Sequence, residues 1–156
     1  MYNSNLTGVQ LDGLYGEISV SDNAIPQTIP SNPVVYTKLD TWTSNGVSEG
    51  VTSEYLNGQI KILSAGNYKL EASLSFKSGT GNIISDCSIF VDGVEQNQAH
   101  FSRKISTAGD VGSASITSIA QLNENSIVDI RLKHDNVSSV DITIVYGNLN
   151  VELVGV

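Results

Sequence analysis

Cysteine, proline and charged residues are scarce in this chain, and their scarcity excludes several classes of protein. Of 156 residues, one is cysteine (Cys87), three are proline and 15% are charged. A lone cysteine cannot form an intrachain disulfide, so the chain is not a disulfide-stapled scaffold. A domain of this length can fold without disulfides or metals, because it buries roughly 68–70% of its unfolded surface. We therefore expect one self-standing domain.

Basic residues and long apolar runs are also scarce. The chain has eight Lys and Arg against sixteen Asp and Glu, which gives a formal net charge of -8. Nucleic acid is therefore not an expected partner, because phosphate binding needs concentrated Lys and Arg. No run approaches the ~18 apolar residues of a membrane span, and the N-terminus has no basic start followed by an apolar run. We expect no membrane partner, no Sec-type signal peptide, and folding in a cytoplasm.

Alternation of apolar and polar residues is abundant, and a period of two is typical of β-strands. In the clearest segment, residues 68–76, every second residue from Tyr68 to Phe76 is apolar. Short strands at regular spacing predict an all-β antiparallel sandwich or barrel. Nine further segments, bounded by Gly, Asn, Asp or Ser, are predicted strands: 16–20, 34–39, 59–63, 83–91, 98–105, 113–122, 127–134, 141–146 and 149–154.

Two segments do not fit this pattern and are predicted loops. Residues 21–33 hold all three prolines, which cannot donate to a strand ladder, and residues 41–50 are mostly polar. Residues 1–13 form a polar candidate arm, which leaves 14–156 as the jelly-roll domain described below. The apolar side chains expected to pack between the sheets are Tyr68, Leu70, Leu74, Phe76, Ile116, Leu122, Leu149, Val151 and Leu153.

Three segments, GNYKLEASLSF, SITSIAQLNENSIVDIRL and GNLNVELVGV, carry a resemblance to a known family. They resemble the jelly roll shared by tumour necrosis factor and the globular domain of complement. In that family Gly-x-Tyr opens a core strand, a Leu precedes a turn that feeds a long apolar strand, and a last strand ends the domain. Gly66 with Tyr68, Leu122 before residues 123–126, and residues 147–156 occupy those places. The resemblance implies an antiparallel jelly-roll sandwich of about ten strands that forms a homotrimer.

The collagen-like stalk of the animal and spore-coat members is missing here. In composition and layout the chain is more similar to the jelly-roll heads of tailed-bacteriophage fibres and capsid decorations. This resemblance implies a structural or adhesive homotrimer on the virion surface: a head fibre, a capsid decoration or a fibre tip. The arm of residues 1–13 would dock on other virion proteins. Two alternatives stay open: a glycan-binding receptor-recognition module that binds host surface glycans, and a bacterial spore or cell-surface domain.

The resemblance also implies which residues form the trimer interface. It places three strands in one sheet whose outer face turns toward the threefold axis, and alternation gives the side chains on that face. Ile119, Val154 and Val156 would form an apolar patch within it. The implied interface residues are Lys69, Glu71, Ser73, Ser75, Ser115, Thr117, Ile119, Gln121, Asn150, Glu152, Val154 and Val156.

No arrangement of residues predicts catalysis, a cofactor or a metal site, so we expect a protein that is not an enzyme. His100 and His134 lie in predicted strands, with no Cys or second His at ligand spacing. Cys87 alternates with apolar residues, as a small core hydrophobe does. Asp92 and Asp110 lie at predicted turns, where a calcium ion bridging two loops stays an open alternative.

Trp42 is the one large aromatic residue in a polar predicted loop, with Tyr36 and Tyr55 near it in the sequence. Such rings would stack on a sugar while neighbouring Asn and Ser side chains bond its hydroxyls. The alternative is that Trp42 fills the end of the barrel or a subunit seam. These three residues are the candidate glycan contacts.

Overall fold

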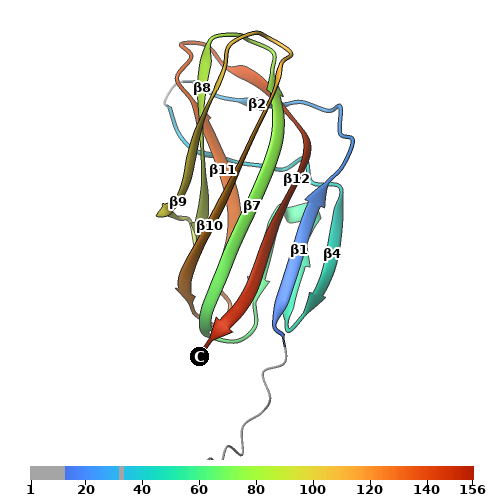
Figure 1. Ribbon diagram of the computed structural model, residues 1–156, viewed down its shortest axis with the longest axis vertical. Coiled ribbons are helices and arrows are strands. Elements are labelled where there is room, and N and C mark those ends of the chain that lie inside the picture. Colours follow the sequence, from blue (N-terminus) through green and yellow to red (C-terminus); the bar gives the residue numbers. More distant parts are fainter. Residues whose placement is uncertain (1–12, 32–33) are drawn as a thin grey trace, which may run out of the picture.

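The computed structural model describes residues 13–31 and 34–156, which form twelve strands in two antiparallel sheets. Figure 1 shows the two sheets stacked face to face as a sandwich. In sheet A the spatial order is β10 (Val111–Leu122), β7 (Gly66–Ser78), β12 (Val140–Gly155), β1 (Tyr15–Val20) and β4 (Ser44–Glu49), with β2 (Gln27–Ile29) paired to β12. In sheet B it is β5 (Val51–Glu54), β6 (Gln59–Ile62), β11 (Ile127–His134), β8 (Ile83–Val91) and β9 (Val94–Ile105), with β3 (Thr37–Lys38) paired to β11.

This architecture confirms the prediction of an all-β antiparallel sandwich and corrects several boundaries. The predicted strands 141–146 and 149–154 are two halves of the single strand β12. The apolar alternation is interrupted there because the β12–β7 register shifts between Ile144 and Tyr146. The predicted strand 34–39 shrinks to β3.

Both predicted loops contain a strand. Segment 21–33 includes β2, and segment 41–50 includes β4. β4 has the sequence SNGVSE and no buried residue, so it lacks the apolar alternation by which a strand is recognised. After β5, a 3-10 turn (η1, Tyr55–Asn57) ends at Gly58, whose φ of 60° is in the left-handed region that favours glycine.

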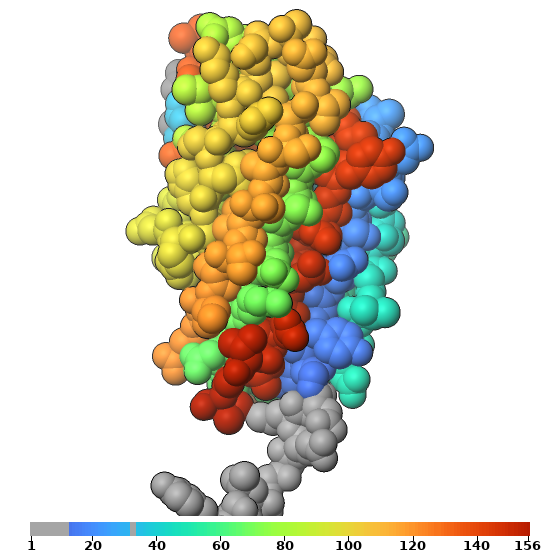
Figure 2. Space-filling view, in the orientation of Figure 1, coloured from blue at the N-terminus to red at the C-terminus, as the bar shows by residue number. Residues whose placement is uncertain are grey.

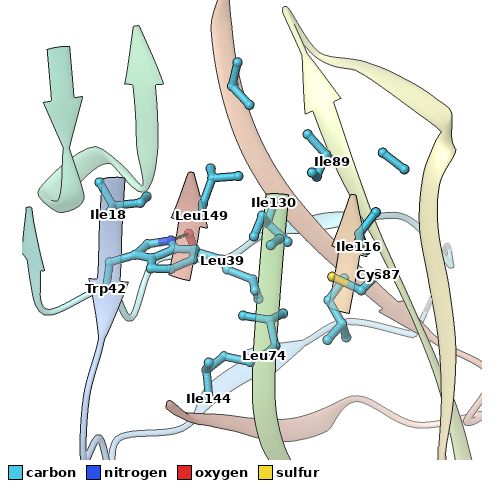
Figure 3. Close-up of a cluster of buried hydrophobic side chains, with 14 of the residues drawn as sticks. Ile18, Leu39, Trp42, Leu74, Cys87, Ile89, Ile116, Ile130, Ile144 and Leu149 are labelled. Carbon is cyan, nitrogen blue, oxygen red and sulfur yellow. Dashed lines mark hydrogen bonds between the residues drawn. The ribbon is translucent and has the colours of Figure 1, made fainter. Parts of the chain in front are cut away.

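The core lies between the sheets, and Figure 3 shows part of it. Of the predicted core residues, those on β7, β10 and β12 are buried, except Leu153, which is partly buried and packs against the core. Leu153 lies where the β12–β7 register shifts again, close to the end of the strand. Cys87 is fully buried, as its place in the alternation predicts.

One end of the sandwich holds the start of β1 and the end of β12 side by side (Figure 1), where the Leu153 N–H donates to the Leu14 carbonyl at 2.8 Å. The opposite end is formed by loops 79–82, 106–110 and 135–139, joined by backbone hydrogen bonds such as Gly109 N–H to Ser78 O at 2.9 Å. Residues 1–12 of the predicted arm lie outside the described residues. In the part of the chain that the structure describes, no helix is long and apolar enough to cross a membrane.

Candidate interaction surfaces

The first candidate surface is the outer face of sheet A, seen in Figure 2, where β10, β7, β12, β1 and β4 lie side by side. The strands of the implied interface are neighbours: Ile119 is opposite Lys69, and Lys69 is opposite Glu152. Val154 lies at a register shift and Val156 beyond the end of β12, both exposed. We call the outward side chains of β10, β7 and β12 between the end of β12 and the level of Ser75 the sheet A face: Lys69, Glu71, Ser73, Ser75, Ser113, Ser115, Thr117, Ile119, Gln121, Asn148, Asn150 and Glu152.

Several polar side chains of the sheet A face already bond to one another. The Ser75 and Ser113 hydroxyls are 2.7 Å apart, and the Ser73 hydroxyl donates to Asn148 Oδ1 at 3.0 Å. Lys69 Nζ is 2.8 Å from a Glu152 carboxylate oxygen and also pairs with Glu71, and these bonds, first to Glu152, raise the pKa of Lys69. These internal bonds lower the cost of removing this part of the face from water, because the bonded donors and acceptors would stay paired when covered.

The edge of sheet A at β10 is the second unusual feature. Edge strands are usually protected against pairing by charges, bulges, proline or shortness. β10 is 12 residues long, contains no charged residue and no proline, and keeps an unbroken register with β7 from Val111 to Leu122. The other edges are protected. β5 is only four residues long, β4 and β9 each have a register shift, and β9 also carries charges such as Glu95 and Arg103.

The outer face of sheet B is built differently, around a nearly buried carboxylate. Asp129, with 3% of its side chain exposed, accepts two bonds from the Arg131 guanidinium at 2.8 and 3.1 Å and lies 3.8 Å from Lys38 Nζ. The guanidinium lies 4.5 Å from the centre of the Phe90 ring. These contacts form a satisfied ionic and cation–π cluster on the face of the sheet.

Tyr36 extends this cluster over sheet B. The Tyr36 ring packs edge-on against the Phe90 ring, with the two ring centres 5.1 Å apart. The Lys133 ammonium lies 4.4 Å from the centre of the Tyr36 ring. The Tyr36 hydroxyl donates to Glu95 at 2.9 Å. Burial, followed by this bond, raises the pKa of Tyr36 far above its usual range. The cluster therefore fastens the segment before β3 onto the outside of sheet B.

The predicted glycan contacts do not form one site. Trp42 is 7% exposed and its indole N–H donates to the Leu39 carbonyl at 3.0 Å (Figure 3), so its ring is core and is not available to stack on a sugar. This burial contradicts the stacking hypothesis for Trp42 and places its ring in the core between the sheets. Tyr36 belongs to the sheet B cluster, whereas Tyr55 lies in η1, where its N–H bonds to Asn45.

A cluster of Ser, His and acid side chains that sequence reasoning did not single out lies at the outer edge of sheet B. His100 Nε2 is 3.3 Å from the Ser102 hydroxyl, but that hydroxyl donates to Asp86 in a short bond. His100 Nδ1 lies 3.8 Å from Glu95. The serine proton is therefore held by a carboxylate and not by the imidazole, so His100 does not activate a nucleophile here. These residues meet because of the register between β8 and β9, and the periodicity of the sequence does not predict that register.

Two other residues of types common in active sites, Ser48 and His134, have structural surroundings. Ser48 is the serine of GVSEG, a Gly-x-Ser-x-Gly pattern, but it lies within β4 and not in the strand-to-helix turn of a nucleophile elbow. His134 is buried, with Nε2 bonded to the Ile29 carbonyl at 2.9 Å and Nδ1 accepting from the Asn136 N–H at 3.2 Å. Its two nitrogens are satisfied by backbone, so it ties the end of β11 to the end of β2.

Cys87 and the carboxylates at the turns also have structural surroundings. Burial raises the pKa of the Cys87 thiol far above its usual range, so it stays protonated. Asp92, a candidate calcium ligand, accepts bonds from the Ile127 N–H and the Ser126 hydroxyl and so holds a turn. Across residues 13–31 and 34–156, no group of three or more His, Cys, Asp or Glu side chains is arranged to hold a metal ion.

Comparison with known proteins defines the fold class. No family model matches the sequence, and no curated protein matches it in sequence. The fold is a tumour-necrosis-factor-like jelly roll, which confirms the fold that the resemblance implied. One solved structure with this fold is Eiger TNF from S. frugiperda, which superposes with a TM-score of 0.60 at 9% sequence identity, over 92% of this chain and 93% of that chain. At this identity the likeness concerns the fold alone.

Proposed function

We propose that the chain is a homotrimeric surface module with a structural or adhesive role, assembled through the sheet A face. The observation that carries this proposal is the character of that face. Most of its side chains are short and uncharged, and its charged residues, Lys69, Glu71 and Glu152, pair with one another. Monomers expose scattered apolar residues, but a broad face with many internally paired polar groups suits an interface.

A cyclic trimer also needs a second surface on each copy. In a closed ring of identical heterologous contacts, one surface of each copy meets a different surface of the next. The edge at β10, where β9 of the same chain packs near Gly112, supplies a second surface directly beside the first. Covering the rest of this edge in the trimer would explain why β10 lacks charges, bulges and proline. The fold class supports the same assembly, because the resemblance to the tumour necrosis factor family implies a trimer.

The proposal assigns this trimer to the virion surface of a tailed bacteriophage, as a head fibre, capsid decoration or fibre tip. Its support is the likeness in composition and layout: low charge, abundant Ser, Thr and Asn, and no disulfide. Because the start of β1 and the end of β12 lie at one end of the sandwich, arms of residues 1–13 would leave a trimer from that end and dock on another virion protein. Deleting the arm should leave unfolding cooperative and abolish incorporation into particles.

The trimer is tested by a charge placed on the proposed interface. Ile119 is 62% exposed on the sheet A face, and three Lys residues there would come close to the threefold axis, where unpaired charge is costly to desolvate. The wild type should sediment as a trimer at micromolar concentration, and Ile119→Lys should be a folded monomer or fail to fold. Val94→Lys is the matched control, since Val94 is 65% exposed at the β8–β9 turn. A monomeric wild type, or an Ile119→Lys trimer as stable as the wild type, would overturn the proposal.

A further inference from the structure

A hollow of about 430 Å³ lies at the loop end of sheet A, beyond the last residues of β7. Its size is within the range of about 300–1,000 Å³ typical of small-molecule sites. The hollow exists because small residues meet there: Gly79, Ala108 and Gly109 from two loops, with the ring of Pro26 on a third side. All of these residues belong to one protomer.

Two side chains of opposite charge line this otherwise small and apolar hollow. Lys77 is opposite Thr143 in the β7–β12 register, so Asp141 is diagonal to it on the neighbouring strand. The Thr28 hydroxyl donates to one carboxylate oxygen of Asp141 at 2.6 Å, which fixes the carboxylate in place. Among the described residues, Lys77 is not in the ion pairs closer than 4.0 Å, which involve other side chains. The Lys77 ammonium and the Asp141 carboxylate therefore do not form an ion pair with each other.

We propose that this hollow binds a neutral, hydroxyl-rich ligand of about the size of one hexose, such as the terminal sugar of a surface glycan. A hydroxyl group both donates and accepts, so neighbouring hydroxyls can bond to Asp141 and Lys77 at once. A ligand with net charge would be attracted by one of these groups and repelled by the other. The Pro26 ring and the Ala108 methyl group provide apolar surface for the C–H face of a sugar ring.

The position of the hollow fits such a role. It lies at the end of the sandwich opposite the start of β1 and the end of β12, so a protein held by its arm would present this end outward. The site is complete in one copy and does not depend on the trimer. Failure of the trimer proposal, read by sedimentation, and failure of the sugar site, read by binding, are therefore distinguishable.

The test is a glycan array of neutral, sialylated and sulfated glycans, probed with the wild type and three variants. Gly79→Leu should fill the hollow. An added Cβ there would lie 3.5 Å from the Asp141 carbonyl, an ordinary contact, and Gly79 is not among the positive-φ glycines, so the backbone tolerates it. Asp141→Asn and Lys77→Gln keep the shape and remove one charge each. Lys61→Gln on β6 is the matched surface control.

The wild type should bind neutral glycans, and Gly79→Leu should abolish binding. Asp141→Asn and Lys77→Gln should each weaken it about tenfold, the loss of one hydrogen bond to a charged group. Lys61→Gln should bind as the wild type does. The proposal would be overturned by a wild type that binds no neutral glycan, by binding confined to anionic glycans, by displacement of the glycan with a free amino-acid zwitterion, or by a folded Gly79→Leu that binds normally.

Discussion

The outer faces of the two sheets differ in the side chains that line them. On sheet B, long side chains pack over one another: the Tyr36 ring lies beside the Lys133 ammonium, and Lys38 lies near Asp129. Sheet B therefore covers part of its own outer face with charged and aromatic side chains. On the sheet A face, the side chains are short and mostly uncharged, apart from one exposed group of paired charges. Paired hydroxyls and amides predominate there, where a second copy is proposed to provide the cover.

The edge strands of the two sheets, β9 and β10, also differ in how they are protected against pairing. β9 combines a register shift with charges, so a second strand cannot extend sheet B easily, whereas β10 has neither. A protein that needed to keep both edges free would protect both. Variants in the core, in the ion pairs and at Tyr36 test whether sheet B stabilises its own outer face and edge while those of sheet A are left for another copy.

The largest effect should come from the core shared by both faces. Leu74 is 1% exposed between the sheets, on the inner side of β7. Leu74→Ala should lower the free energy of unfolding by about 2–5 kcal/mol, through lost transfer energy and the cavity left behind. Denaturant unfolding measures it. A loss below about 0.5 kcal/mol, the scale of surface substitutions, would mean that Leu74 is not core.

Ion pairs on the two faces should differ in strength. Asp129→Ala leaves Arg131 and Lys38 without their carboxylate; because both cations keep access to water, we expect a loss of about 1–3 kcal/mol. Glu152→Ala on the sheet A face should cost much less, because that ion pair is exposed and screened. Chemical unfolding of both variants, below the concentration at which copies associate, makes the comparison. Equal losses would contradict the view that the nearly buried ion pair on sheet B contributes more than the exposed one on sheet A.

Tyr36→Phe should have a small effect at neutral pH, about 1 kcal/mol for the lost bond to Glu95. Its effect should depend on pH. Burial and then Glu95 raise the pKa of the folded tyrosine above its ordinary 10.0, so the folded protein keeps a proton that the unfolded chain loses. This stabilisation is complete below pH 10 and is lost as the pH rises toward the folded pKa. The difference in unfolding free energy between wild type and Tyr36→Phe should therefore narrow as the pH rises above about 10. A constant difference would contradict the assignment.

Periodicity predicted the central strands well, because residues such as Leu70, Leu74 and Ile116 alternate with polar neighbours and one face of each strand is buried. It missed β4, whose six residues include none that is buried. It also divided β12, because the register shift near Tyr146 breaks the pattern locally.

The candidate surfaces were only partly predictable. Alternation gave the direction of the side chains on β7, β10 and β12, and the family resemblance placed these strands in one sheet. Pairings such as Ser73 with Asn148, or Tyr36 with Glu95, depend on strand register and on where a loop crosses a sheet. These are non-local properties, and a single sequence carries little local signal of them. Trp42 was misleading for the same reason: its polar neighbours in sequence are not its neighbours in the fold.

Hydrogen exchange of the two edge strands tests the central claim, that the sheet A side is covered by other copies, most directly. Amide protection reports whether a backbone group is shielded from water, residue by residue. Exchange should be followed in β10 and β9 at a protein concentration where copies associate and at a much lower one. We expect β10 amides to exchange more slowly at the higher concentration, while β9 amides are unchanged. Exchange in β10 that is independent of concentration, or protection that instead grows in β9, would contradict the account.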